Sequence, residues 1–198
     1  MARVRHLRST PIATFDVAIA RAREGDSAGF QWLFDAFNRQ LAGFARARGC
    51  RDVDAVASET LARAFHRADR FSGDESAFRS WLFAICRNIL IDEARAEARR
   101  PRVSNGAVLG DLAAGDDVAS EVVADVGDRA AELLAHLTEK QREVVSLRIV
   151  AGLSIAEVAD VMDCPETAVK ALQHRALRTL QKKISSAPVS PGEELSLS

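Results

Sequence analysis

The stretch LTEKQREVVSLRIVAGLSIAEVADVMDCPETAVKALQHRALRTLQKKI, residues 137–184, decides the fold of the C-terminal part of the chain. Its apolar spacing and its breakers predict a helix, a glycine turn, a short helix, a tight turn and a longer final helix. Thr138 with Gln141, and Ser154 with Glu157, match the capping box, in which side chains satisfy the free backbone N–H groups that begin a helix. A short helix, a turn and a longer helix have the dimensions of a helix-turn-helix.

The final helix of this stretch has two different faces. At about 100° per residue, one side gathers apolar residues that predict a core face: Val169, Leu172, Ala176, Leu180 and Ile184. The opposite arc carries Lys170, Ala171, His174, Arg175 and Arg178. Residues 167–186 hold five basic side chains and no acidic one. A cationic face on the second helix of a helix-turn-helix suits the major groove of DNA, although a solvated surface helix has the same pattern.

A second informative stretch is FRSWLFAICRNILIDEAR, residues 78–95. On a helix, Asn88, Asp92 and Arg95 fall within about 40° of Trp81, beside a broad apolar face. The loop RFSGDES just before it is bracketed by two phenylalanines. Such groups suit unstacked bases, because aromatic rings stack on bases, amides read their edges and arginines hold phosphates. The same spacing also fits a core tryptophan next to a solvated polar seam.

The rest of the N-terminal part also predicts helices. Ala, Arg, Leu and Glu dominate, Tyr is absent, and no segment alternates at period two. Side chains that suit helix N-caps predict starts at Thr14, Ser27, Asp52 and Ser76. The segment DVDAVASETLARAFHRADR is amphipathic, so its exposed side can bind a partner helix or remain solvated. We therefore predict an all-α protein with two small helical domains, the second ending in a helix-turn-helix.

Composition and charge divide the chain into segments. It has 198 residues, of which 47 % are hydrophobic, and it carries 27 basic and 28 acidic side chains. These values exclude a wholly disordered chain and a uniformly basic nucleic-acid coat protein. Residues 101–127 carry one basic and five acidic groups and predict a flexible linker. The predicted segments are an N-terminal extension (1–13), a first domain (14–102), an acidic flexible linker (103–127), a second domain (128–186) and a disordered tail (187–198).

Other protein classes find no support in the sequence. No apolar run approaches the ~20 residues of a membrane span, and no secretory signal is apparent. Cys50, Cys86 and Cys164 are far apart, which predicts buried free thiols in a cytoplasmic protein rather than disulfides or a zinc site. The histidines show no ligand spacing, and neither a phosphate-binding loop nor a nucleophile motif is present. We therefore expect no catalytic residue, no metal, no cofactor and no membrane insertion.

Together the two helical parts resemble a bacterial sigma factor of the extracytoplasmic-function class, over residues 14–102 and 128–186. DVDAVASETLARAF resembles the family's helix that binds the RNA polymerase clamp. FRSWLFAICRNILIDEAR has the pattern Trp-Leu-x-x-Ile-x-x-Asn-x-x-x-Asp-x-x-Arg of the promoter-melting helix. The final segment resembles the closing helix-turn-helix. The occurrence of all three segments in this order makes the resemblance specific.

The resemblance implies a non-enzymatic protein that binds core RNA polymerase and promoter DNA, and it leads us to expect an anti-sigma factor as a further partner. Capture and melting of the −10 element would fall to Phe71, Ser72, Gly73, Phe78, Trp81, Asn88, Asp92 and Arg95. The −35 element would be read by Lys170, Ala171, His174, Arg175 and Arg178. Contact with the core polymerase would involve Asp54, Glu59 and Arg63. The acidic linker would follow the RNA exit path, as in the family.

Two alternatives stay open at this point. A stand-alone helix-turn-helix regulator would bind DNA without polymerase, usually as a dimer. The seam from Trp81 to Arg95 and the lack of dimer heptads argue against this alternative. A protein that imitates a sigma factor would bind polymerase without melting DNA. Transcription from a matched promoter separates the imitator from a true sigma factor.

Overall fold

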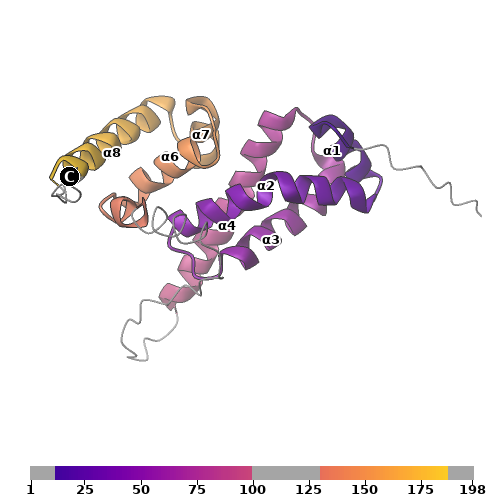
Figure 1. Ribbon diagram of the computed structural model, residues 1–198, viewed down its shortest axis with the longest axis horizontal. Coiled ribbons are helices and arrows are strands. Elements are labelled where there is room, and N and C mark those ends of the chain that lie inside the picture. The colour runs from indigo at the N-terminus through magenta and orange to yellow at the C-terminus, as the bar shows by residue number, and fades with distance from the viewer. Residues whose placement is uncertain (1–11, 100–129, 187–198) are drawn as a thin grey trace, which may run out of the picture.

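The computed structural model describes residues 12–99 and 130–186, and within these ranges all regular structure is helical (Figure 1). The first module comprises α1 (Phe15–Arg23), α2 (Ser27–Ala47), α3 (Val53–Phe65), the short 3₁₀ turn η1 (Ala68–Arg70) and α4 (Glu75–Arg99). The second module comprises α6 (Glu139–Ile149), α7 (Ile155–Met162) and α8 (Glu166–Ser186). The predicted all-helical class is confirmed. The predicted linker at 103–127, the tail at 187–198 and most of the N-terminal extension lie outside the described residues.

The predicted capping boxes of the second module are both present. The Thr138 hydroxyl accepts from the Gln141 N–H, while the Gln141 side chain accepts from the Thr138 N–H at 3.0 Å. Ser154 and Glu157 exchange the same pair of bonds at the start of α7. Each box satisfies two backbone donors that would otherwise lack partners. These caps therefore fix where α6 and α7 begin.

In the first module, two predicted helix starts are displaced by a residue or two. Asp26, not Ser27, caps α2 by accepting from the Ala28 N–H at 2.9 Å. Asp74, not Ser76, accepts from the Ala77 N–H at 2.9 Å at the start of α4. In both cases an aspartate one or two residues before the serine takes the capping position, since its carboxylate is at least as good an acceptor. Asp52 caps α3 as predicted, by accepting from the Ala55 N–H at 3.0 Å.

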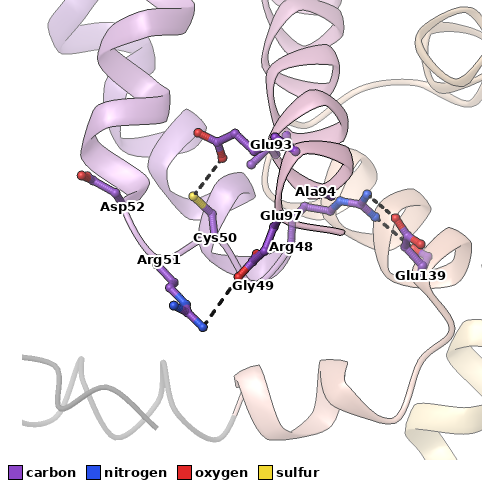
Figure 2. A pocket seen from close by; sticks show the side chains of 11 residues that line it. Arg48, Gly49, Cys50, Arg51, Asp52, Glu93, Ala94, Glu97 and Glu139 are labelled. Carbon is purple, nitrogen blue, oxygen red and sulfur yellow. Dashed lines mark hydrogen bonds and ion pairs between the residues drawn. The ribbon is translucent and has the colours of Figure 1, made fainter. Parts of the chain in front are cut away.

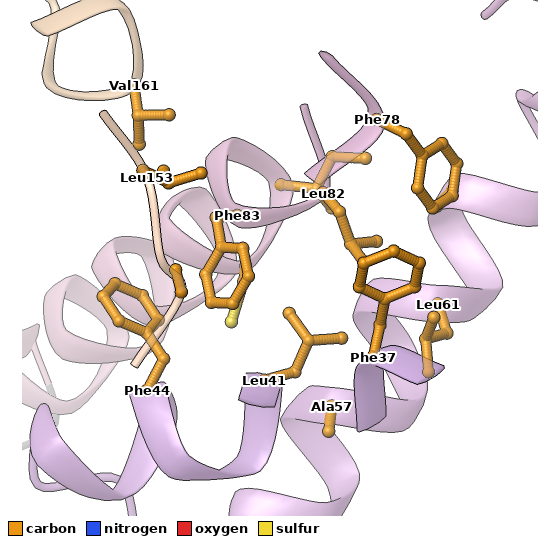
Figure 3. Close-up of a cluster of buried hydrophobic side chains, with 14 of the residues drawn as sticks. Phe37, Leu41, Phe44, Ala57, Leu61, Phe78, Leu82, Phe83, Leu153 and Val161 are labelled. Atoms are coloured by element: carbon orange, nitrogen blue, oxygen red, sulfur yellow. The ribbon is translucent and has the colours of Figure 1, made fainter. Parts of the chain in front are cut away.

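The core of the first module is built from phenylalanines on α2 and α4 (Figure 3). Phe44 and Phe83 meet edge to face with ring centroids 5.5 Å apart, and Phe37 lies 5.5 Å from Phe78. All four side chains are buried. Such pairs add about 1 kcal/mol each beyond the area that they bury. The N-terminal half of α4 is therefore packed on α2 through Phe78 and Phe83.

The two modules share one continuous hydrophobic core. Leu153 and Val161 of the second module lie next to Phe83 of α4 in Figure 3, and all three belong to the same buried cluster. A Cβ on Gly43 of α2 would stand 3.1 Å from the Val150 side chain, so these backbones pass close together. The sequence predicted a flexible join between independent modules. The patterning gave no sign that the modules pack against each other.

The core face of α8 is shorter than its sequence pattern predicts. Val169 and Ala176 are fully buried, and Leu180 packs on the cluster formed with α6. Ile184, predicted to lie in the core, is 60 % exposed. The periodicity continues through the last turn of α8, but the described part of the chain provides no neighbour there. The apolar spacing therefore predicted the helix correctly, but the predicted burial of Ile184 is wrong.

Candidate nucleic-acid interface

A pocket with stacked aromatic walls opens where η1 leads into α4. Phe71 and Trp81 stack with ring centroids 5.3 Å apart and planes 22° apart. The pocket has a volume of about 430 Å³ and is lined by Arg67, Arg70, Phe71, Ser72, Ala77 and Trp81. We call it the aromatic pocket. Its apolar walls and its two arginines combine a stacking surface with positive charge.

The floor and the rim of the aromatic pocket come from other predicted residues. Phe78 is fully buried and contacts both Phe71, at 5.2 Å between centroids, and Trp81, at 5.7 Å. We expected Phe78 among the residues that capture the −10 element, but its complete burial places it in the core beneath the pocket, where it supports Phe71 and Trp81. Gly73 at the rim has φ +145°, and a Cβ there would approach Ala77 to 2.8 Å and the Phe71 ring to 3.3 Å. Only glycine fits between them without displacing the ring.

Arg67 and Arg70 were missed as site residues at the sequence level. Both are exposed, and both line the aromatic pocket. A signal was present, because the two arginines are three residues apart just before Phe71. In a 3₁₀ turn, residues at this spacing face the same side. From the sequence we assigned this segment to the end of an α-helix. In an α-helix, with 3.6 residues per turn, residues three apart face the same side less exactly.

A polar seam runs from the aromatic pocket along the outer face of α4. Asn88, Asp92 and Arg95 are exposed, and at about 100° per residue they lie on the same side as Trp81. Asp92 and Arg95 form a loose surface pair at 3.7 Å. Such a pair contributes little and exchanges readily with another partner. The predicted seam is therefore accessible to a ligand as well as continuous.

The opposite face of α4 is covered by the second module. Glu143 of α6 is buried, with its side chain 5 % exposed, and its carboxylate lies 2.6 Å from Arg87 of α4 and 3.8 Å from Arg48, the C-cap of α2. Arg48 also pairs with Glu139 at 2.9 Å (Figure 2). We call these four residues the Glu143 cluster. A buried carboxylate with two cationic partners fixes the register of the two modules, since misplacing it would leave a charge unpaired.

A further contact between the modules involves the cap of α7. The Ser76 hydroxyl at the start of α4 donates to the Glu157 carboxylate. Partial burial acts to raise the pKa of Glu157, but hydrogen bonds from Ser76 and Ser154 outweigh it and lower this pKa to about 2. Glu157 therefore stays ionised and serves two purposes, as a helix cap and as a tie to α4.

A second pocket, of about 470 Å³, lies between the turn at 48–52 and the end of α4 (Figure 2). The polar groups in it pair with each other: Arg51 lies 3.8 Å from Glu97, and the Cys50 thiol donates to Glu93 at 3.8 Å. Burial raises the pKa of the Cys50 thiol, so it is a poor nucleophile. Within the described ranges, no cluster of His, Cys, Asp and Glu is suited to hold a metal ion.

The three cysteines are free, but only one of them is buried as predicted. Cys86 is fully buried, and desolvation raises the pKa of its thiol to about 12. Cys50 and Cys164 are half-buried. Both lie in turns at the edge of the core, just after α2 and α7. Their spacing in the sequence does not reveal this partial exposure.

The outer face of α8 is open along its whole length. Helix α7 is followed by a tight turn through Asp163, with φ +50°, and then by α8. These three parts form the helix-turn-helix. The predicted DNA-contacting side chains are all exposed: Lys170, Ala171, His174, Arg175 and Arg178. Lys170 forms a surface pair with Glu166 at 3.1 Å. None of these side chains is covered by the first module.

The outer face of α3 is also free. Asp54, Glu59 and Arg63 are exposed, and Arg63 pairs with Glu59 at 2.6 Å one turn away. The opposite side of α3 packs on α2 through Val56 and Leu61. No helix in the described ranges is long and apolar enough to span a membrane. The described residues thus present three separate polar surfaces on a common apolar core.

Comparison with known proteins identifies the family to which the two modules belong. Residues 33–100 match the family described as Sigma-70 region 2, and residues 128–180 match Sigma-70, region 4. The ECF RNA polymerase sigma factor BldN of Streptomyces coelicolor is 32 % identical over 175 residues, which is 83 % of this chain and 63 % of BldN. The ECF RNA polymerase sigma-E factor of Haemophilus influenzae is 29 % identical over 184 residues, which is 86 % of this chain and 95 % of that protein.

Solved structures agree in fold. CnrH, in a complex with the cytosolic domain of CnrY, gives a TM-score of 0.64 at 27 % identity and covers 87 % of this chain and 97 % of CnrH. The sigma factor RpoE of Bartonella quintana, in a complex with the anti-sigma factor NepR, gives a TM-score of 0.59 at 21 % identity over 80 % of this chain and 98 % of RpoE. The second likeness concerns the fold alone.

The two matched regions together cover more than half of the chain, so the chain belongs to the sigma-70 family, within its ECF class of RNA polymerase sigma factors. As a sigma factor it binds RNA polymerase and directs promoter recognition and transcription initiation. It is not an enzyme. The aromatic pocket and α4 lie within region 2, and the helix-turn-helix lies within region 4.

Proposed function

We propose that the aromatic pocket takes an unstacked base of the −10 element, that α8 reads the −35 element, and that α3 binds core polymerase. The stacked pair of Phe71 and Trp81, with arginines beside it, is the observation that carries this proposal. A base has two flat faces and a phosphate on each side. The pocket offers a flat aromatic wall and two arginines in its lining, which suit the base and the phosphates.

Melting needs no bond chemistry from the protein. Flipping a base out of the stack costs roughly a few kcal/mol, and stacking on an aromatic side chain returns about 1–3 kcal/mol per base. Asn88, about two turns beyond Trp81 along the seam, carries an exposed amide that can donate to and accept from a base edge. Arg95 continues the seam with a phosphate-binding side chain. The protein traps bases that the duplex releases and so shifts the equilibrium towards open DNA.

The −35 element is read by the exposed face of α8. Ala171 lets the helix backbone come close to the floor of the major groove, while Lys170 and Arg175 reach bases or phosphates on either side. The polymerase contact falls on α3, where Asp54, Glu59 and Arg63 are exposed and Glu59 and Arg63 lie one turn apart. The surface pair between Glu59 and Arg63 is weak enough to exchange for a partner's charges.

Promoter binding requires the two modules to separate. Elements centred near −35 and −10 lie about 25 base pairs apart, which is roughly 85 Å at about 3.4 Å per base pair. The packed arrangement keeps Arg48 and Glu139 2.9 Å apart and Arg87 and Glu143 2.6 Å apart, and we infer that it does not place the two DNA-binding faces at promoter spacing. The 30 residues from 100 to 129 can reach ~100 Å when extended, so the chain length allows the separation. Polymerase would hold the modules at promoter spacing and make two weak contacts into one bivalent contact.

The remaining expectations fit the same mechanism. Folded units at 14–102 and 128–186 would act as the two promoter-binding domains, in the cytoplasm, where the polymerase works. CnrH, at 27 % identity, was solved in a complex with the cytosolic domain of CnrY, which supports a regulatory protein partner, such as the expected anti-sigma factor, for this chain. Such a partner would act by covering the surface that binds polymerase, which we place on the exposed side of α3.

Run-off transcription tests the proposal. Core RNA polymerase, with and without this protein, is incubated with a library of genomic fragments, and the 5′ ends of the transcripts are sequenced. New starts that share a −35 and −10 pair support the proposal and supply the promoter for every later test. Polymerase binding without new starts would indicate a protein that imitates a sigma factor. DNA binding without polymerase binding would revive the stand-alone regulator.

A further inference from the structure

Arg23, the last residue of α1, reaches across to the wall of the aromatic pocket. Its Nε donates to the carbonyl oxygen of Ala68 at 3.2 Å, and its Nη2 donates to the carbonyl oxygen of Phe71 at 2.5 Å. These acceptors lie 45 and 48 residues further along the chain. They stand at the two ends of the η1 turn. One guanidinium group therefore holds the whole segment that carries Phe71.

The main chain at Phe71 determines where its ring lies. The residue ends η1 and turns into an extended conformation, with φ −76° and ψ 136°, before the loop to α4. Its ring then stacks on Trp81, which is fixed on α4. A guanidinium presents its donors in a rigid plane, so two bonds from it restrict both position and rotation of the segment. Without them, nothing else in the described structure donates a side-chain hydrogen bond to these two carbonyls.

Helix α1 is a firm base for this side chain. A Cβ on Gly29 of α2 would lie 2.5 Å from the backbone nitrogen of Ala22, so the two helices touch through their backbones. Phe15 at the other end of α1 packs on Phe78, with centroids 5.2 Å apart, directly under the aromatic pocket. Both ends of α1 are therefore held by contacts with the rest of the module, and Arg23 projects from its C-terminal turn.

We propose that Arg23 is a positioning residue for promoter melting. It acts through Phe71, by holding the 68–71 segment so that the Phe71 ring stays on Trp81 and the pocket keeps its shape for a base. The inference rests on the proposed function, because it assumes that the aromatic pocket takes a promoter base. It assigns a role in melting to α1, a helix that contributes no side chain to the pocket wall.

A double-mutant cycle on the full-length protein tests this role. Holoenzyme is assembled with wild type, Arg23→Ala, Phe71→Ala or the double variant, and the rate of open-complex formation is measured on the promoter found by run-off mapping. Arg23→Ala should slow melting about fivefold to tenfold in the wild-type background, the range expected for charge-assisted hydrogen bonds that are partly solvated. It should have little further effect once Phe71 is alanine. Residues that act through one another are not additive in such a cycle.

Three controls sharpen the result. Arg51→Ala removes an arginine whose side chain is 90 % exposed and should leave melting unchanged. Arg23→Lys keeps the charge but not the planar pair of donors, and should restore only part of the rate. Thermal unfolding of Arg23→Ala should remain close to wild type, which separates loss of positioning from loss of folding.

The outcomes distinguish the inference from the proposed function. If the losses from Arg23→Ala and Phe71→Ala multiply in the double variant, Arg23 acts independently, for instance on a phosphate, and the inference is wrong. Full activity in Arg23→Lys would assign the effect to charge alone and would overturn it equally. If Phe71→Ala itself melts the promoter normally, the aromatic pocket is not a base pocket, and the proposed function fails together with the inference.

Discussion

Two neighbouring residues on α4, Arg87 and Asn88, have opposite surroundings. Arg87 points to the second module and forms a 2.6 Å ion pair with the buried Glu143. Asn88 points away from it and is exposed on the seam that leads to the aromatic pocket. The docked face of α4 therefore holds the molecule in its packed form, whereas the free face is available to DNA. The residue type alone does not reveal whether a side chain joins the modules or stays exposed. On the same helix, Arg87 pairs with the buried Glu143, whereas Arg95 is exposed.

The largest expected effect falls on the docked face. Glu143→Ala removes the anion of the Glu143 cluster and leaves Arg48 and Arg87 facing each other without it. Breaking a buried pair on one side costs about 3 kcal/mol or more. We expect the modules to separate, with a larger radius of gyration in small-angle scattering and a lower unfolding midpoint in urea.

Glu139→Ala is the matched control for that prediction. Glu139 contacts the same Arg48, but its side chain is 78 % exposed, so its removal should cost at most about 1 kcal/mol. Equal effects from Glu139→Ala and Glu143→Ala would mean that burial of the carboxylate does not fix the packed form. That result would remove the distinction between a docked and a free face.

The second module offers the same contrast on α8. Lys170→Ala or Arg175→Ala should weaken holoenzyme binding to the −35 element by ~1–3 kcal/mol if the side chains reach base edges. Lys183→Ala, in the last turn of the same helix, should have a smaller effect that does not depend on the −35 sequence. Filter binding or fluorescence anisotropy on matched and mutated −35 elements measures the difference. Equal losses on both DNA sequences would show that Lys170 and Arg175 contact only phosphates.

Asn88→Ala tests the free face of α4. Open-complex formation should fall about tenfold, or ~1.4 kcal/mol, while initial promoter binding changes little. Stability should stay within about 0.5 kcal/mol of wild type, because the side chain is exposed. Arg87→Ala, one residue earlier, should show the reverse: a clear loss of stability and no defect in trapping bases. Equal loss of binding and melting in Asn88→Ala would count against its place beside the base pocket.

The smallest predicted effect concerns pH. The pKa of Glu157 is about 2 in the folded protein against an ordinary 4.5, so its contribution to stability is complete above pH 4.5 and declines as the pH falls towards 2. Glu157→Gln keeps a capping side chain but cannot titrate. The stability difference between wild type and Glu157→Gln in urea should therefore be largest at pH 7 and shrink between pH 4.5 and 3. A difference that stays constant over this range would mean that the carboxylate charge is not what ties α7 to α4.

Much of the site was predictable because it depends on local pattern. The capping boxes at Thr138 and Ser154 fix α6 and α7, and helical spacing places Asn88, Asp92 and Arg95 on one side of α4. These are short-range properties that the order of residues determines. The outer face of α8 was found in the same way.

Other features could not be predicted, since they depend on which elements meet. Ile184 has a core-type position but is 60 % exposed among the described residues, and Phe78 has an aromatic ring next to the pocket but lies wholly inside the protein. Arg67 and Arg70 join the pocket because the chain tightens into a 3₁₀ turn just there. Arg23 bonds to carbonyls 45 and 48 residues away, and no spacing rule connects them.

The sequence by itself determined the helices, their caps, their two-faced patterning and the resemblance to the ECF class, because each of these arises within one or two helical turns. The tertiary structure alone decided which face of α4 is covered, that Glu143 is buried between Arg48 and Arg87, and that α1 supports the aromatic pocket through Arg23. Burial and pairing are properties of surfaces brought together across the chain. A polar or apolar side chain becomes structural or available only when the fold supplies, or withholds, a neighbour.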